Sequence, residues 1–158
     1  MIVYLSFLLI SLIWLAFLFL GPYLLTFGGK YSNLAEIYYL LFGIICHQNP
    51  ERSYFVWGHQ MPVCVRCFGI YAGILLGLLI YPLLKKTDNT VMPKIKYLIL
   101  FCLPILFDGI SQILRLYPSP HYIRLITGIL ASAAGVFYIL SILNQLYISF
   151  TNIKANKT

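Results

Sequence analysis

Charged residues are scarce in this sequence. Asp, Glu, Lys and Arg together make up 9% of the 158 residues, and only four of them are acidic. Soluble globular domains carry about 25% charged residues, so the composition excludes a soluble domain. The 61% hydrophobic content and the lack of any long polar stretch instead indicate an integral membrane protein with no separate soluble catalytic domain.

The shortage of acidic residues leaves a net charge of +7. The basic residues are scattered singly, apart from the pair Lys85 and Lys86, and they are not interleaved with exposed aromatic residues. This pattern does not favour a nucleic-acid partner. We expect these cations to set the membrane topology and to contact anionic lipid. No sequence feature predicts a protein partner or an oligomeric state.

Apolar runs long enough to cross a membrane define the predicted fold. A helical span needs about 20 apolar residues, and four segments meet this length: 2–25, 65–84, 96–115 and 123–148. A fifth run, 34–46, has only 13 residues and contains Glu36, so we expect a short interfacial or re-entrant helix there. The prediction is an all-α bundle of four spans that forms a single membrane domain over residues 1–158.

Lysine residues predict the orientation of the bundle. The loop 85–96 contains four lysines, and the tail adds Lys154 and Lys157. Because cytoplasmic loops retain an excess of basic residues, we expect a multi-pass protein of the cell membrane with both termini in the cytoplasm. The region 26–64 then faces outward.

Cysteine and histidine are also rare, but they are clustered. Three of the four cysteines and two of the three histidines lie within residues 46–67. Cys64 and Cys67 form a C-x-x-C motif where the second span begins, and Arg66 lies between them. A helix N-terminus and a nearby cation both favour thiolate. Thiolates serve both metal ligation and disulfide exchange, so the motif alone does not choose between them.

A metal site is the first interpretation of this cluster. Three thiols and one imidazole suit tetrahedral zinc or a similar metal, and the predicted ligands are Cys46, His47, Cys64 and Cys67. His59 is the alternate to His47. Adjacent residues 46 and 47 can both bind one ion only if the backbone turns between them, which the following Gln-Asn-Pro sequence permits.

Three other interpretations remain. The layout resembles quinone-linked membrane disulfide oxidoreductases, and in that case the reactive residues would be Cys64, Cys67 and Cys46. Those enzymes relay electrons through a second cysteine pair, whereas Cys102 lies deeper in the third span. A metal or small-solute transporter is a further possibility, and buried cysteines without any ligand are the simplest. Whether the protein is an enzyme stays open.

The third predicted span contains an acidic residue, which is costly in a membrane and therefore a candidate functional residue. Asp108, Gln112 and Arg115 follow the helical repeat and share one face. We predict an outward-opening polar cavity beneath the thiol cluster, with Arg115 or Arg124 as the counter-ion of Asp108. Its residues are Asp108, Gln112, Arg115, Arg124, Arg52 and Arg66. A purely structural ion pair between the third and fourth spans is the alternative.

Glycine residues recur at four-residue spacing after the C-x-x-C motif. Gly69, Gly73 and Gly77 present a bare ridge, which allows a neighbouring helix to approach closely. The last span has a looser version of this pattern in Gly128, Ser132 and Gly135.

Several segments resemble a known family. The sequences CHQNPERSY, PVCVRCFGIYAG, DGISQILR and RLITG are similar to small prokaryotic membrane proteins grouped as domain of unknown function 2085. The resemblance covers roughly residues 46–128, and it brings no activity with it. It implies a shared polar site composed of Cys46, His47, Cys64, Arg66, Cys67, Asp108 and Arg115.

Overall fold

Four helical segments of this protein are long and apolar enough to cross a membrane. The computed structural model describes the backbone of residues 1–155 and the side chains of residues 1–152, so the side chains of Lys154 and Lys157 lie outside the described part. The four segments are Ile2–Phe27, Val65–Leu84, Ile95–Ile113 and His121–Asn152. The predicted all-α membrane bundle with four spans is therefore confirmed.

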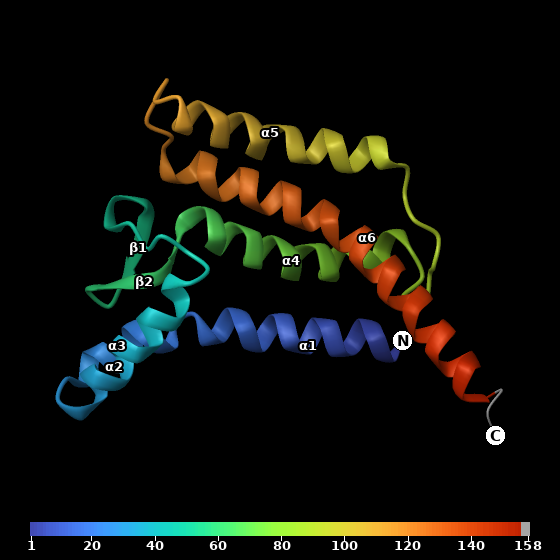
Figure 1. Cartoon of the computed structure of the whole chain (residues 1–158), viewed down its shortest axis with the longest axis horizontal. Coiled ribbons are helices and arrows are strands. Elements are labelled where there is room, and N and C mark those ends of the chain that lie inside the picture. Colours follow the sequence, from blue (N-terminus) through green and yellow to red (C-terminus); the bar gives the residue numbers. More distant parts are fainter. Residues whose placement is uncertain (156–158) are drawn as a thin grey trace.

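The first segment is interrupted, although the sequence predicts one span over 2–25. Two residues separate the end of helix α1 (Ile2–Phe17) from the start of α2 (Leu20–Phe27), and α2 leaves the line of α1 to lie beside α3 (Figure 1). Pro22 explains the break, because proline cannot donate a backbone hydrogen bond and its ring clashes with the carbonyl four residues earlier, that of Leu18. The break therefore lies at Leu18 and Phe19.

The short helix α3 (Lys30–Gly43) differs in its bounds from the predicted segment 34–46. It begins after Gly28 and Gly29, which both adopt positive φ angles. Its buried face, formed by Ala35, Tyr38 and Phe42, follows the helical repeat. Because α3 ends at Gly43, Cys46 lies in the loop that follows it.

A small β-hairpin follows α3 and is absent from the sequence prediction. After the 3-10 turn η1 (Pro50–Arg52), strand β1 (Ser53–Val56) pairs antiparallel with β2 (His59–Cys64), and Ser53 lies opposite Cys64. Trp57 and Gly58 connect the strands with φ angles of 53° and 79°. Two positive φ angles are typical of a tight hairpin turn. The hairpin leads directly into the C-x-x-C motif.

Helices α4 (Val65–Leu84), α5 (Ile95–Ile113) and α6 (His121–Ala155) form the rest of the bundle. A Cβ atom at Gly69 would lie 2.6 Å from the Leu125 carbonyl oxygen, and one at Gly128 would lie 2.7 Å from the Arg66 carbonyl oxygen. Only glycine permits this spacing of α4 and α6. The predicted close packing is confirmed here.

The same contact extends along the glycine ridge of α4. Cβ atoms at Gly73 and Gly77 would also collide with α6, whereas one at Gly135 would meet no atom within 4 Å. Gly135 is therefore not part of the predicted contact.

The two ends of the bundle carry different parts of the chain. The N-terminus, the α4–α5 loop and the C-terminal part of α6 lie at one end, and the hairpin lies at the other (Figure 1). Asn144 of α6 fixes the α4–α5 loop, because its Nδ2 donates to the carbonyl oxygens of Thr87 at 2.9 Å and Asn89 at 3.0 Å. Which end faces the cytoplasm stays a prediction.

Candidate metal centre and polar cleft

Three of the predicted ligands converge at the start of α4. The sulfur atoms of Cys46, Cys64 and Cys67 all lie within 4.8 Å of one another. They come from the loop after α3, the last residue of β2 and the first turn of α4. The backbone N–H of Cys64 donates to the Cys46 sulfur at 3.1 Å, across 18 positions of sequence. The hairpin thus returns the chain to the cysteine that precedes it.

The electrostatic environment favours thiolate in this cluster. Cys64 is the N-terminal cap of α4, next to the unpaired backbone N–H groups of a helix start. The pKa of Cys64 lies well below its usual value, because the Cys46 thiol and then the Cys67 thiol donate hydrogen bonds to its thiolate. The lowered pKa favours the thiolate form of Cys64, which is the form that binds metal ions.

Both the sulfur atoms of the cluster and the apolar residues around Cys46 suit a metal ion that binds thiolates. Sulfur atoms bound to one zinc ion at about 2.3 Å in tetrahedral geometry are roughly 3.8 Å apart, so the observed grouping needs only a small contraction. Buried Phe42, Met61 and Val63 belong to the same hydrophobic core as Cys46. This apolar surrounding limits the access of water to the Cys46 sulfur.

Gln48 fixes the loop that positions Cys46. Its backbone has a φ of 48°, so the chain reverses there. Its Nε2 donates to the carbonyl oxygens of Tyr39 at 2.7 Å and Pro62 at 3.0 Å, while Gln60 Nε2 donates to the Gln48 carbonyl oxygen at 2.6 Å. The Tyr39 hydroxyl in turn donates to the Gln60 carbonyl oxygen. These contacts tie α3 to β2.

Neither predicted histidine belongs to the sulfur group among the described residues. His47 is exposed, because the backbone turns at Gln48, after the histidine, and not between Cys46 and His47 as shared ligation requires. His59 starts β2 beside the hairpin turn, and Cys64 follows it five positions later along the extended strand, roughly 16 Å away. The grouping is therefore three cysteines, in contrast to the predicted set of three cysteines and one histidine.

The fourth cysteine, Cys102, lies on α5 and outside the cluster, and all four cysteines are free thiols. No second cysteine pair for an electron relay is formed within the described residues.

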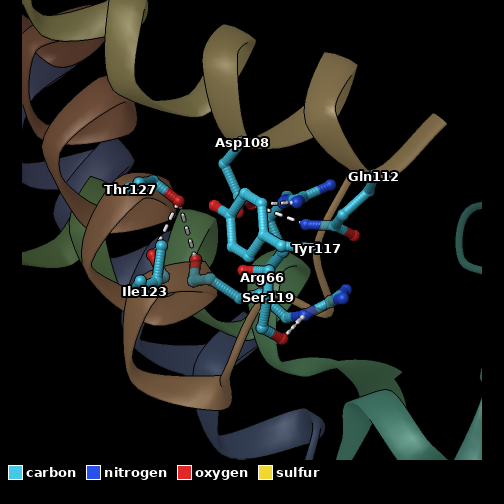
Figure 2. A network of polar contacts seen from close by, with 8 residues as sticks. Arg66, Asp108, Gln112, Tyr117, Ser119, Ile123 and Thr127 are labelled. Carbon is cyan, nitrogen blue, oxygen red and sulfur yellow. Dashed lines mark hydrogen bonds and ion pairs between the residues drawn. The ribbon is translucent and has the colours of Figure 1, made fainter. Parts of the chain in front are cut away.

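Asp108 is buried at the centre of a polar network near the end of α5. It is 1% exposed and forms an ion pair with Arg66 of α4. Gln112 Nε2 donates to the same carboxylate at 2.8 Å, and the Tyr117 hydroxyl donates to it at 2.9 Å. Figure 2 shows these three side chains converging on Asp108. The carboxylate also raises the pKa of the Tyr117 phenol, because it accepts the hydrogen bond of the neutral form.

The counter-ion of Asp108 differs from the predicted Arg115 or Arg124. Helix α5 ends at Ile113, and Arg115 adopts a φ of 54° and is exposed, so it leaves the helix face that carries Asp108. Arg124 is 5% exposed, and its Nε donates to the Ser119 carbonyl oxygen at 2.9 Å. Arg66 lies in the first turn of α4, and its long side chain reaches Asp108 of α5.

A polar cleft of about 530 Å³ opens beside the cluster. Its wall is formed by the segment before the hairpin, the end of β2, and helices α4, α5 and α6. The residues of the wall include His47, Arg52, Cys64, Arg66, Gln112 and Arg124. Arg115 does not line it. Cys64 therefore belongs to both the sulfur cluster and the cleft wall.

Comparison with known proteins identifies a family for this chain. The family model described as "Predicted membrane protein (DUF2085)" matches residues 46–139. The chain belongs to this family. The match begins at the first cysteine of the cluster and includes every residue of the polar network.

Two archaeal proteins are similar to this chain in sequence. An uncharacterized protein of Methanocaldococcus jannaschii is 43% identical over 143 residues, which are 88% of this chain and 91% of that protein. An uncharacterized protein of Methanothermobacter thermautotrophicus is 35% identical over 107 residues, or 66% of this chain and 92% of that protein. No solved structure matches the chain.

Some residues of the site are missed by sequence reasoning. Gln48, Gln60 and Tyr39 fix the loop and the hairpin, and Tyr117 completes the Asp108 network. A usable signal exists for Gln48 alone, because it directly follows the Cys-His pair in a segment with turn character. The others act only through contacts between separate elements.

Proposed function

We propose that this family member is a membrane metal-binding protein that holds one zinc or similar thiolate-preferring ion with Cys46, Cys64 and Cys67. The ion links the loop after α3 and the end of β2 to the first turn of α4. A fourth ligand, water or a solute, reaches the ion from the cleft, because Cys64 also lines the cleft wall.

The observation that carries this proposal is the convergence of three sulfur atoms within 4.8 Å of one another. They come from segments that the chain brings together through a hairpin and the Gln48 contacts, and the Cys64 N–H is already directed at the Cys46 sulfur. Backbone N–H groups of this kind stabilise thiolate ligands. Softer metals remain compatible with an all-sulfur donor set.

The test is the metal content of protein purified in mild detergent. We expect about one equivalent of metal, with sulfur distances near 2.3 Å by X-ray absorption if the ion is zinc. Cys64→Ser and Cys46→Ser should each lose most of the metal. Cys102→Ser is the matched control and should retain it. His47→Ala should also retain it, since His47 lies outside the sulfur group.

The same measurement separates metal binding from disulfide exchange. Three adjacent thiols also provide a pair and an attacking thiol, which exchange requires. If the isolated protein contains no metal, and thiol trapping in intact cells finds a disulfide among Cys46, Cys64 and Cys67, then the metal proposal is wrong and a thiol-disulfide function replaces it.

A further inference from the structure

The cleft beside the thiol cluster is strongly basic. Three arginines, Arg52, Arg66 and Arg124, line it, and no acidic residue does. Asp108 is the carboxylate beside the cleft, and its charge is already matched by Arg66. The only other ion pair within the described residues joins the N-terminus to Asp88 at the far end of the bundle. Two positive charges, those of Arg52 and Arg124, are therefore left without an acidic partner.

Arg124 is the less expected of these two charges. It is 5% exposed, and its Nε is held by the Ser119 carbonyl oxygen. Its two terminal nitrogens have no hydrogen-bond acceptor in the described part of the chain, although the side chain lines the cleft. A guanidinium without an ion pair that faces the cleft beside two further arginines favours an anion from outside the chain.

Arg66 is the third arginine of the cleft wall. One of its terminal nitrogens is paired with Asp108, and its side chain is 24% exposed, so part of the guanidinium still faces the cleft. The neutral side chains of Gln112 and Asn49 also line the cleft. The wall therefore offers donors from four elements to a single ligand.

We propose that this cleft binds a phosphate group, either of a small phosphorylated solute or of a lipid headgroup. Planar guanidinium groups match the oxygen atoms of phosphate through paired hydrogen bonds, and low-dielectric walls strengthen the attraction. A volume of about 530 Å³ exceeds what a bare phosphate needs, and it leaves room for an attached organic group. The site lies at the end of the spans, where lipid headgroups also lie.

Close helix packing holds the site together. Gly69 and Gly128 allow the first turns of α4 and α6 to touch, which places Arg66 and Arg124 on the same cleft. The Arg66–Asp108 pair adds the end of α5. Arg66 and Arg124 are thus fixed before a ligand arrives, which lowers the ordering cost of binding.

The test measures binding of two probes to the full-length protein in neutral detergent by isothermal titration calorimetry. The first probe is inorganic phosphate and the second is short-chain phosphatidylglycerol, with short-chain phosphatidylcholine as a lipid of no net charge. Binding of both anions indicates a site for any accessible phosphate group. Binding of the lipid alone indicates a headgroup site. Absence of binding by both anions overturns the proposal.

Matched variants connect binding to the cleft. Arg124→Gln should raise the dissociation constant for phosphate by about tenfold or more, because a charged hydrogen-bond donor is lost. Arg52→Gln should weaken it as well, and as an exposed residue it tests the site even if Arg124→Gln fails to fold. Arg115→Gln is the control, because Arg115 is an exposed arginine outside the cleft. Equal loss in all three variants would mean unspecific attraction and would contradict the proposal.

Metal analysis of the same samples keeps the two proposals separate. Arg52→Gln retains the three cysteines and should retain the metal. Phosphate binding by protein that contains no metal would leave the phosphate site intact and remove the proposed metal function. Protein that contains metal but binds neither anion would support the metal function and overturn the phosphate site.

Discussion

Arg66 of α4 is paired with Asp108 of α5, and Arg66 lies between the two cysteines of the C-x-x-C motif. The turn that contributes Cys64 and Cys67 to the sulfur cluster is therefore also anchored to a second span. Because the sulfur cluster and the Arg66–Asp108 ion pair share this helical turn, a change that disturbs one of them also displaces the other.

We expect Arg66→Gln to destabilise the protein by about 3 kcal/mol or more, because it leaves the buried Asp108 carboxylate without its cation. Asp108→Asn should cost less than Arg66→Gln, since the remaining Arg66 is partly exposed to the cleft. Thermal unfolding in detergent measures both. Asp88→Asn, which breaks the exposed pair with the N-terminus, should have little effect. Similar losses for Arg66→Gln and Asp88→Asn would contradict the buried pair.

Gly73→Ala should destabilise the contact of α4 with α6. The added methyl group would lie 2.6 Å from the Cα atom of Ile129, so the helices must move apart, at a cost of about 1–3 kcal/mol. Gly135→Ala is the control, because its methyl group would meet no atom within 4 Å. Unfolding in detergent should separate the two variants. Equal stability would show that α4 and α6 do not pack this closely.

Gln48→Glu should loosen the hairpin. A carboxylate cannot donate to the Tyr39 and Pro62 carbonyl oxygens, so two hydrogen bonds are lost and two acceptors are left without their partner. Hydrogen exchange of β2 should become faster, and metal content should fall. Gln145→Glu, which removes one hydrogen bond at an exposed site on α6, should change neither. Unchanged exchange in the Gln48 variant would refute its role.

The predicted orientation can be tested by cysteine labelling in intact cells. Met92 of the α4–α5 loop and Phe55 of β1 are both exposed, and these two elements lie at opposite ends of the bundle (Figure 1). We expect a membrane-impermeant maleimide to label Phe55→Cys in intact cells. It should label Met92→Cys only after the cells are opened. Both signals are measured relative to the labelling of the native chain, which has free cysteines of its own. The reverse pattern would place the thiol cluster in the cytoplasm.

The four spans are predictable because the length of an apolar run is a local property of the sequence. The break in the first span is also locally encoded. Pro22 is visible in the sequence, and its effect on the carbonyl of Leu18 follows from proline geometry alone. The hairpin is harder to predict, because its strands are short and do not alternate regularly between polar and apolar residues.

The approach of Cys46 to the C-x-x-C motif follows from a short return loop, but the ligand set does not. Whether His47 joins Cys46 depends on one φ angle, and the reversal comes at Gln48. The partner of Asp108 depends on how α4, α5 and α6 are rotated relative to one another. Spacing within α5 favours Arg115, whereas the α5 helix ends before that residue.

The order of the chain sets an order of assembly in the membrane. Residues 46–67 contain the whole sulfur cluster, so its three thiols can meet as soon as α4 has been synthesised. Arg66 in the same turn must wait for Asp108, which follows 42 positions later, and the glycine face of α4 must wait for α6. A newly made chain therefore passes through a stage with a complete thiol cluster, an uncompensated guanidinium and an uncovered helix face. Capture of a metal ion at this stage would precede closure of the bundle, and the supply of metal during synthesis would then influence how many chains complete their insertion.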